Sequence, residues 1–520
     1  MRRGREQHPY LGGASVLLID RRKREGITNR GRWSAAERGG YGGGTFPSLG
    51  ATRMALRFKL QLVVVADDEQ VSVDEIAVLN KEHARQEHLG LTLAEAKALL
   101  LELQRQILTH QIAAFLAART RCPTCGRARG LKDHKAIVFR TLFGKLELAS
   151  PRLRRCPCQH SGQASSSPLV ELLPEHTAPE LLYMEAEWAS LVSYGLTVTA
   201  LRDFLPVDAA LNAPTVRRDT LRVARRCEAE LGPEPRFPLA GCPGECASLP
   251  APPDPITVGI DGGYLRHWEH KRTHFVAIVG QSVPADGPTK RFGFVQSYDP
   301  KPRRHLATVL RGQNLQHNQE LVFLSDGEES LRQLQCYLRP HSQHLLDWFH
   351  LTMQLTGLGQ FLKGLIQVDA ERAAELQEAL DHTKWNLWHG KVKRALEWLW
   401  HIEWRMWHFA TRYAKFSALA RAVHGFQRYI RRNAHLIPNY AQRRRAGQAI
   451  STAFVESLVN SLLSKRFAKK RSMQWTPEGA HLLLQARTRT LNGDLAETFR
   501  RWYPAFSLAD QPADDTLLAA

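Results

Sequence analysis

Two short apolar, β-branched runs in this chain each end in an Asp-Gly pair, at Asp261 and at Asp326. Such runs are typical of buried strands, so we expect each carboxylate at the C-terminal end of a strand, where open sheets place their chemistry. A third carboxylate, Glu456, lies in a helical pattern. Carboxylates that converge repel one another unless cations compensate them. The pattern therefore predicts a site for two divalent metal ions.

Four cysteines in two close pairs form a second candidate metal site: Cys122, Cys125, Cys156 and Cys158. Two thiolate pairs on the tips of hairpins match a closed, structural, four-cysteine zinc site, because zinc binds soft, deprotonated thiolates. The second pair is C-x-C, tighter than the usual C-x-x-C, which leaves His160 as an alternative fourth ligand. Reduced free thiols are the competing interpretation. We predict a zinc ribbon whose hairpin turns near Gly144.

The elements that must position the three carboxylates are those of an α+β domain with a mixed sheet. We predict strands over 256–260, 274–281, 291–297, 321–324 and 344–346. Helices are expected to begin near Arg303, Glu328 and Asp347. A tryptophan-rich stretch, 356–446, fills most of the gap between Asp326 and Glu456 and is helical by pattern. Most of its tryptophans are expected in a core, with one or two available to stack on nucleic acid bases.

Five motifs occur in a fixed order: GIDGG (259–263), SDG (325–327), DWFH (347–350), VESLVNSLLSKRF (455–467) and WTPEGAHLLLQARTRTL (475–491). The set resembles the catalytic region of a DDE transposase with an RNase H-like fold. More closely, the chain resembles the ISKra family of bacterial insertion-sequence transposases, over roughly residues 54–505. The resemblance implies metal-dependent DNA strand cleavage and strand transfer with two Mg²⁺ or Mn²⁺ ions. It implies that Asp261 bridges both ions, Asp326 holds one and Glu456 the other.

Asp347 and His350 resemble the C/D-x-x-H motif that follows the second aspartate in related transposases. This implies that His350 lies near the active site and positions the flanking strand or the scissile phosphate. Asp347 could instead be the N-cap of the helix that follows it.

The chain is strongly basic, with 71 Lys and Arg against 51 Asp and Glu and a net charge of +20. A polyanion, most often nucleic acid, is the usual partner of such a protein. The alternative is that the positive charge serves solubility alone. Two helices predicted over 190–206 and 213–231, the second capped by Thr215 and basic near its start, form a helix-turn-helix-like pair. The DNA contacts we predict are Arg217, Arg218, Arg222, Lys465, Arg466, Lys469, Lys470 and Arg471. An ordinary helical bundle with solvated basic faces is the alternative.

We expect residues 68–119 to be helical, with Thr92 and Glu95 forming a capping box at the start of a core or dimer helix. Residues 1–53 are predicted to be a disordered basic extension; alternatively, the start is assigned too early and Met54 is the true one. A helical region (54–120), the zinc ribbon (121–160), the DNA-binding region (170–232) and a proline-rich linker (233–255) are predicted to follow. The catalytic domain is predicted over 256–355 and 447–505, around a helical insertion (356–446), and a tail covers 506–520.

No apolar run approaches the roughly 18 residues of a membrane-spanning helix, and eight cysteines in so long a chain do not make a disulfide scaffold. We expect a cytoplasmic, nucleoid-associated bacterial protein. The resemblance implies a homodimer on double-stranded DNA. Two other functions share these features: an RNase H-like nuclease without strand transfer, and a non-catalytic zinc-ribbon DNA-binding protein derived from a transposase.

Overall fold

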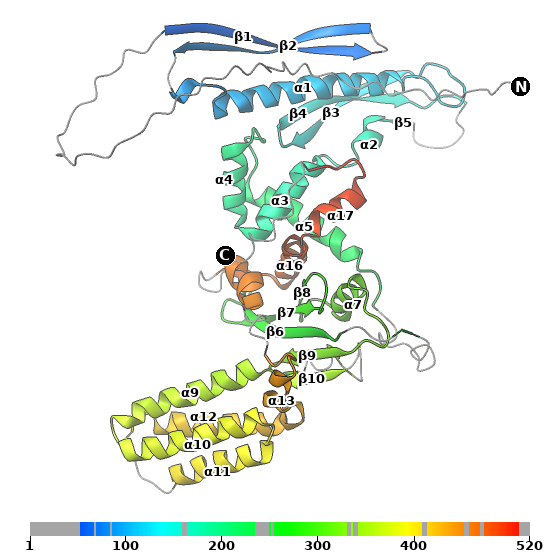
Figure 1. The fold of residues 1–520 in the computed structure, drawn as a ribbon. Coiled ribbons are helices and arrows are strands. Elements are labelled where there is room, and N and C mark those ends of the chain that lie inside the picture. The colour runs from blue at the N-terminus through cyan, green and yellow to red at the C-terminus, as the bar shows by residue number, and fades with distance from the viewer. Residues whose placement is uncertain are drawn as a thin grey trace, which may run out of the picture. The chain divides into compact units, whose positions relative to one another are not determined.

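The computed structural model describes residues 53–66, 69–83, 86–158, 164–234, 249–250, 254–329, 334–335, 338, 342–407, 413–451, 457–467 and 473–508. Residues from Met54 onward form one compact unit of mixed α and β structure (Figure 1). The predicted basic extension, apart from Arg53, and most of the proline-rich linker lie outside the described residues.

The first described elements are two long strands, β1 (Arg53–Ala66) and β2 (Glu69–His83), which pair as a two-stranded sheet. The prediction that residues 69–83 are helical is therefore wrong. Their β-branched residues, such as Val73 and Ile76, favour extended chain over helix. A 3₁₀ turn, η1 (Gln86–His88), then leads to α1 (Leu93–Ala117). The predicted capping box of Thr92 and Glu95 at the start of α1 is confirmed.

The cysteine region forms a three-stranded antiparallel sheet of order β3 (Leu131–Thr141), β4 (Gly144–Arg154) and β5 (Ser165–Ser166). The β3–β4 turn at Gly144 is confirmed, and its φ of +127° explains the glycine. A Cβ at Gly144 would lie 2.2 Å from Cδ1 of Leu101, so α1 packs directly against this turn.

Four helices follow: α2 (Leu169–Leu172), α3 (Pro179–Leu191), α4 (Tyr194–Phe204) and α5 (Ala213–Ala229). The predicted N-cap of α5, Thr215, is wrong. Asn212 caps the helix in extended conformation and accepts a hydrogen bond from the N–H of Thr215 at 3.0 Å. The asparagine is the stronger capping residue, and Pro214 is well suited to the first turn.

A mixed sheet forms the centre of residues 256–346. Its strands are β6 (Ile256–His267), β7 (His274–Val283), β8 (Lys290–Val295), β9 (Leu321–Ser325) and β10 (Gln343–Leu346), in the order β10-β9-β6-β7-β8. β6, β9 and β10 are parallel, and β7 is antiparallel to both β6 and β8. The five predicted strands are confirmed. β6 continues further than expected, to His267, where β11 (Gln474–Trp475) pairs with it.

Helices cover both faces of this sheet. On one face, α7 (Arg303–Gly312) packs on Ile260 and its neighbours. On the other, η3 (Asn460–Ser464), α15 (Lys465–Phe467) and α16 (Pro477–Leu491) share a core with Leu265. α17 (Leu495–Trp502) packs on α3.

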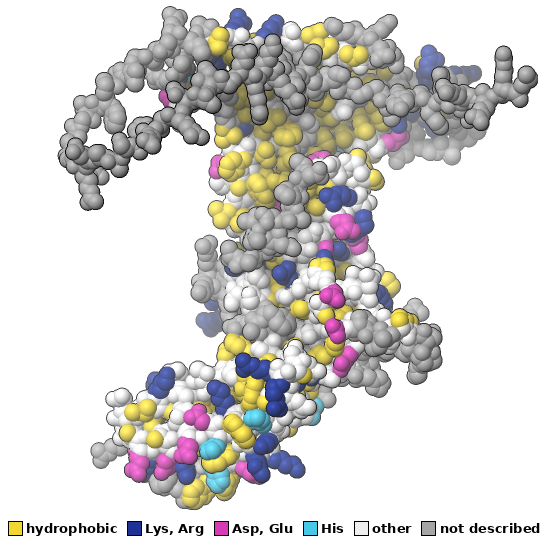
Figure 2. Space-filling model, viewed as in Figure 1, with side chains coloured by type: hydrophobic (Ala, Val, Ile, Leu, Met, Phe, Trp, Pro, Cys, Tyr) yellow, Lys and Arg dark blue, Asp and Glu magenta, His cyan; other side chains and the backbone are white. Residues whose placement is uncertain are grey.

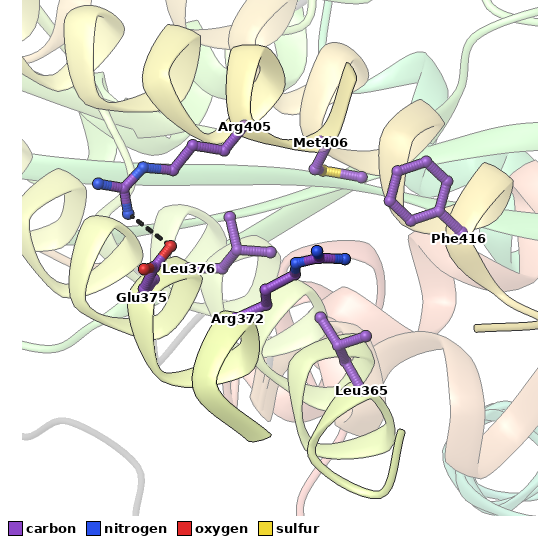
Figure 3. A pocket seen from close by; sticks show the side chains of 7 residues that line it. All are labelled: Leu365, Arg372, Glu375, Leu376, Arg405, Met406 and Phe416. Atoms are coloured by element: carbon purple, nitrogen blue, oxygen red, sulfur yellow. Dashed lines mark hydrogen bonds and ion pairs between the residues drawn. The ribbon is translucent and has the colours of Figure 1, made fainter. Parts of the chain in front are cut away.

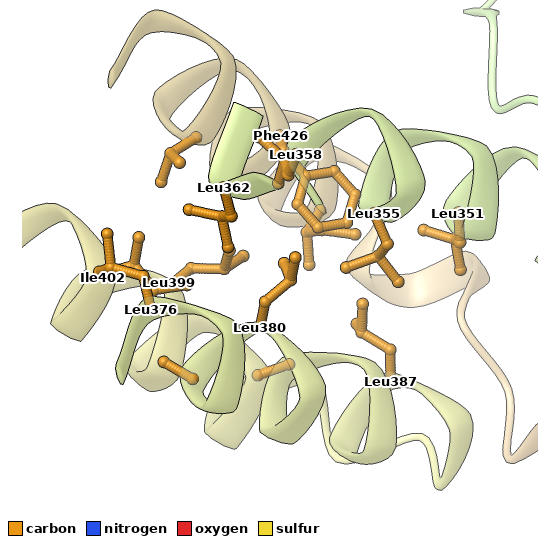
Figure 4. Close-up of a cluster of buried hydrophobic side chains, with 14 of the residues drawn as sticks. Leu351, Leu355, Leu358, Leu362, Leu376, Leu380, Leu387, Leu399, Ile402 and Phe426 are labelled. Atoms are coloured by element: carbon orange, nitrogen blue, oxygen red, sulfur yellow. The ribbon is translucent and has the colours of Figure 1, made fainter. Parts of the chain in front are cut away.

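A helical region follows β10 and has its own core of buried leucines (Figure 4). Its helices are α9 (Trp348–Ile366), α10 (Ala370–Trp388), α11 (Val392–Trp407), α12 (Phe416–Arg432), η2 (Ala434–Leu436) and α13 (Tyr440–Arg445). The tryptophans divide between core and surface. Trp388 and Trp398 pack against the core, whereas Trp385, Trp400 and Trp404 are about half exposed.

Candidate active site

Asp261, in β6, and Asp326, the residue after β9, lie level with each other, because β6 and β9 are parallel. The pairing of β6 with β9 ends at Gly259 and Leu324, two residues before each aspartate. The prediction that Asp261 lies at the C-terminal end of its strand is wrong, because β6 continues to His267 along β7. It does lie just past the end of the β6–β9 ladder. The two aspartates therefore lie at the same level, where the parallel pairing opens.

Asp347 joins them from β10. Its N–H donates to the carbonyl of Ser325 at 2.9 Å, which places it beside Asp326. Asp347 is fully buried and caps α9, accepting the N–H of Phe349 at 2.9 Å. The N-cap interpretation is therefore confirmed. His350 lies on the first turn of α9, with Nε2 3.8 Å from a carboxylate oxygen of Asp347.

Asp261 is within electrostatic range of Asp326, Asp347 and His350. Burial raises the pKa of Asp261, and the nearby charges of Asp326 and Asp347 raise it further. The N–H of Gly262, which donates to Asp261 at 2.7 Å, and the charge of His350 act in the opposite sense. The carboxylates thus repel one another, and carboxylate oxygens are hard ligands of the kind that Mg²⁺ prefers.

Glu456 lies outside the described residues, but the helix that follows it contacts β6. A Cβ at Gly263 would lie 2.2 Å from Cδ1 of Leu463 and 3.8 Å from Cγ1 of Val459. Gly263 is two residues after Asp261 and so on the same face of the strand. The helical residues 457–467 therefore cover the face of the sheet that carries Asp261.

Part of that helix, Asn460–Ser464, is a π-helix. Such segments are rare and occur often at functional sites. The buried guanidinium of Arg487, on α16, donates to the carbonyls of Ser461, Leu462 and Ser190, the second at 2.9 Å. These bonds fix the segment against α3 and α16. No pattern in the sequence marks Arg487.

The helical region also contacts the strand ends. The hydroxyl of Tyr429 donates to the carbonyl of Asp326, and that of Tyr440 to the carbonyl of Leu346, each at 2.7 Å. Burial, with the charges of Asp326 and Asp347, raises the pKa of Tyr429. Nothing in the sequence identified these tyrosines, because each lies about a hundred positions from its partner.

The four cysteines are brought together. Their Sγ atoms all lie within 4.8 Å of one another, with Cys122–Cys158 at 3.5 Å and Cys125–Cys156 at 3.4 Å. A zinc ion about 2.3 Å from each sulfur of a tetrahedron separates the sulfurs by about 3.8 Å, so the cluster fits that ion. Backbone N–H groups, foremost that of Cys125, lower the pKa of Cys122 to about 6. Cys158 completes the set; His160 lies outside the described residues.

The predicted basic residues of α5 are exposed. Arg217 is exposed, and so are Arg218 and Arg222, which pair with the buried Asp219 at 3.3 and 3.5 Å. Residues 205–212 connect α4 to α5, a longer link than the three or four residues of a standard helix-turn-helix. The opposite face of α5 packs on α3 and α16.

The basic residues predicted to contact DNA after Glu456 differ in their exposure to solvent. Lys465 is exposed, whereas Lys469, Lys470 and Arg471 lie outside the described residues. The prediction that Arg466 contacts DNA is contradicted, because its side chain is buried. Its Nε donates to the carbonyl of Ala189 at 2.7 Å, and its guanidinium lies 4.8 Å from the ring of Tyr194.

A pocket in the helical region is separate from these groups (Figure 3). It is lined by Leu365, Arg372, Glu375, Leu376, Arg405, Met406 and Phe416, with Arg405 paired to Glu375 at 3.3 Å. Leu365 is at the end of α9 opposite to Asp347, roughly 27 Å along the helix at 1.5 Å per residue. The pocket is therefore not part of the carboxylate site.

Comparison of the chain with protein-family models and with curated proteins finds no match in either set. Among the described helices, none combines the length and apolar character needed to cross a bilayer.

Proposed function

We propose that this chain is a DDE transposase, which cuts DNA at the ends of an insertion sequence and joins those ends to target DNA. The observation that carries the proposal is the level placement of Asp261 and Asp326, with Asp347 beside them, where the parallel strands separate. The strand order, with only β7 reversed, supports an RNase H-like fold for this domain.

Asp261, Asp326 and Glu456 would hold two Mg²⁺ or Mn²⁺ ions. When bound, the ions would activate the attacking oxygen and stabilise the leaving oxygen of the phosphodiester. Val459 and Leu463, which follow Glu456 in the chain, lie next to Gly263 on the face of β6 that carries Asp261, and this supports a role for Glu456 in the set.

His350 would position the scissile phosphate or the flanking strand. Asp347 supports this role in two ways, because it caps α9 and lies beside the imidazole. A buried cap fixes the first turn of the helix, and with it the direction of His350.

Double-stranded DNA would bind along the exposed arginines of α5, Arg217, Arg218 and Arg222, and at Lys465. The +20 net charge supports a polyanionic partner. Because phosphate contacts release counterions, affinity should fall steeply with added salt.

The four cysteines would hold a structural zinc ion, which would fix the hairpin of β3 and β4. The sulfur distances and the N–H groups around Cys122 support this. We expect one equivalent of zinc per purified wild-type chain and none in a Cys122→Ser/Cys125→Ser variant. Wild-type protein that is fully folded without zinc would contradict the proposed zinc site.

The test of function is a joining assay with DNA that carries the inverted repeats flanking the gene and a plasmid target. The wild-type chain should cut and join in Mg²⁺. Asp261→Asn and Asp326→Asn should each lose roughly 100-fold or more, about 2.7 kcal/mol of transition-state stabilisation. The matched control is Asp286→Asn, since Asp286 is exposed in the turn after β7.

The outcomes separate the competing functions. Cutting without joining favours a nuclease, and DNA binding without either favours a non-catalytic DNA-binding protein. Full activity in Asp261→Asn refutes the assigned role.

A further inference from the structure

The hairpin that joins β6 to β7 carries exposed aromatic side chains next to basic ones. Its tip, residues 264–274, has the sequence YLRHWEHKRTH. Tyr264 is 60% exposed and Trp268 is 58% exposed, more than any other tyrosine or tryptophan that the structure describes. We call residues 264–274 the β6–β7 tip. Rings of this size are seldom left in water without a partner, so the tip is a candidate binding surface.

One face of β6 is covered at its start and open at its end. Ile260 belongs to the face that packs against α7. Because side chains alternate between the two faces of a strand, the same face continues through Gly262 to Tyr264 and Arg266, and Trp268 follows at the turn. The opposite face stays covered by η3, α15 and α16. The cover from α7 therefore ends where the aromatic and basic side chains begin.

Hydrogen bonds within the tip and to β11 hold its backbone in place. The N–H of Trp268 donates to the carbonyl of Trp475 at 2.9 Å, in β11. The N–H of His267 donates to the carbonyl of Thr273 at 3.1 Å, and its ring Nδ1 accepts the N–H of His270 at 3.2 Å. The exposed rings thus stand on a fixed backbone. A surface ordered in advance loses less freedom when it binds a partner.

The cations of the tip are not neutralised. Within the part of the chain that the structure describes, Arg266, Lys271 and Arg272 form no ion pair, and Glu269 is the one acid among residues 264–274. Positive charge alone does not mark a site, because Figure 2 shows Lys and Arg side chains scattered from the N-terminal elements to the helical region. The tip is distinguished by unpaired cations that lie beside exposed rings.

An open strand edge connects the tip to the carboxylates. β6 pairs with β9 as far as Gly259 and with β11 from Arg266 onward. Between these points, that edge of β6 pairs with no strand among the described residues. A Cβ at Gly262 would lie 4.0 Å from Oε2 of Glu328, two residues after Asp326. The chain that follows β9 therefore borders the open face of β6.

The chemistry of the tip fits nucleotides whose bases are unpaired. Proteins bind single strands by stacking bases on aromatic rings and placing cations along the phosphates. Within a duplex, each base is already stacked on its neighbours, so its face becomes available only where the duplex opens. Tyr264 is three residues after Asp261, roughly 10 Å along the strand at 3.3 Å per residue. A strand that passes the carboxylates can reach this ring within a few nucleotides.

We propose that Tyr264 and Trp268 bind unpaired bases of the DNA strand next to the site of cleavage, with Arg266, Lys271 and Arg272 on its phosphates. That the polyanion is DNA rests on the proposed function. What the tip adds is that the strand beside the carboxylates is held out of the duplex.

The test is binding of the full chain, in EDTA, to two fluorescent probes followed by anisotropy. One is a mixed-sequence single strand of about 20 nucleotides, longer than the span of most such sites, and the other is the blunt duplex of the same sequence. Stacking tolerates any sequence, so the natural ends are not needed. Tyr264→Ala/Trp268→Ala should weaken binding of the single strand roughly tenfold or more, and of the duplex less than about twofold.

The matched control is Trp400→Ala, because Trp400 is 52% exposed on α11. It should bind both probes as the wild type does.

The cations are tested separately by the salt dependence of binding. Each phosphate contact on a single strand contributes about 0.7 to the slope of log affinity against log salt. Arg266→Gln/Lys271→Gln/Arg272→Gln should therefore lower that slope by about 2. An unchanged slope contradicts the phosphate contacts.

A wild-type chain that does not bind the single strand overturns the proposal. So does a Tyr264→Ala/Trp268→Ala variant that loses both probes equally, or neither. If that variant does not fold, photocrosslinking of the wild type to a single strand containing iodouracil decides. Crosslinks to Tyr264 or Trp268 support the proposal, and crosslinks confined to other residues contradict it.

These results are independent of joining activity. A chain that binds the single strand through the tip but never joins DNA refutes the transposase alone. A chain that joins DNA, and whose single-strand binding survives Tyr264→Ala/Trp268→Ala, refutes the role of the tip alone.

Discussion

The negative charge of Asp261 is unfavourable in the metal-free protein. Burial and the neighbouring carboxylates raise its pKa above the ordinary value of 3.8. An unfolded chain would restore the ordinary pKa, so ionisation of Asp261 favours unfolding. The stability linked to this group is complete below pH 3.8 and is lost as the pH rises through the folded-state pKa.

Replacing Asp261 by asparagine should therefore stabilise the metal-free protein at pH 7. We expect Asp261→Asn in EDTA to melt on the order of 2 °C higher than the wild type. The gain should shrink as the pH falls toward 4, and Mg²⁺ should reduce it by stabilising only the wild type. Thermal unfolding followed by circular dichroism measures this, with Asp286→Asn as the unchanged control. A lower melting temperature for Asp261→Asn at pH 7 contradicts the electrostatic account.

Individual residues were predictable to different extents. Asp261, Asp326 and Asp347 could be placed together because apolar runs mark parallel strands, whose ends align. The role of Tyr429 could not, since its partner lies 103 positions away. The burial of Arg466 was also missed, because a basic run alone does not show which member packs on Tyr194.

Among the elements, β6, which carries Asp261, contacts the π-helix of Asn460–Ser464, which follows Glu456 in the chain. Gly262 and Gly263 are adjacent but have different neighbours. A Cβ at Gly262 would meet Val276 at 3.5 Å, an ordinary contact, whereas one at Gly263 would overlap Leu463. The second glycine is thus required by packing and the first is not.

This difference gives a paired prediction. Gly263→Ala should destabilise the protein by about 1–3 kcal/mol, the usual cost of overpacking. Gly262→Ala should be neutral or stabilise by up to about 1 kcal/mol, because alanine loses less backbone entropy on folding. Urea unfolding of both variants measures the difference. Equal costs for the two would mean that the helix after Glu456 does not pack on β6 as described.

The sequence predicted elements best where the pattern was unambiguous. The five strands of the central sheet are short apolar runs and were found. Residues 69–83 were predicted to be helical but form a strand. Charged residues between Val73 and Ile76 interrupt the apolar–polar alternation that would mark a strand. The extension of β6 to His267 was missed, since two glycines follow Asp261 and suggested a turn.

At the scale of the whole molecule, the helical region and the sheet meet at the carboxylates. Tyr429 and Tyr440 tie the helices to the carbonyls of Asp326 and Leu346. The sequence indicated a helical insertion but not its contacts, because helical periodicity identifies an apolar face and not what that face packs against. The same limit applies to α1, whose apolar face has little cover within the described residues.

The central claim is that carboxylates from distant parts of the chain hold metal ions together. Binding of Mn²⁺ to the purified chain, followed by electron paramagnetic resonance or calorimetry, tests this most directly. The wild type should bind two ions at this site, and Asp326→Asn and Glu456→Gln should each weaken binding at least tenfold while Asp286→Asn does not. Unchanged Mn²⁺ binding by Glu456→Gln would contradict the account.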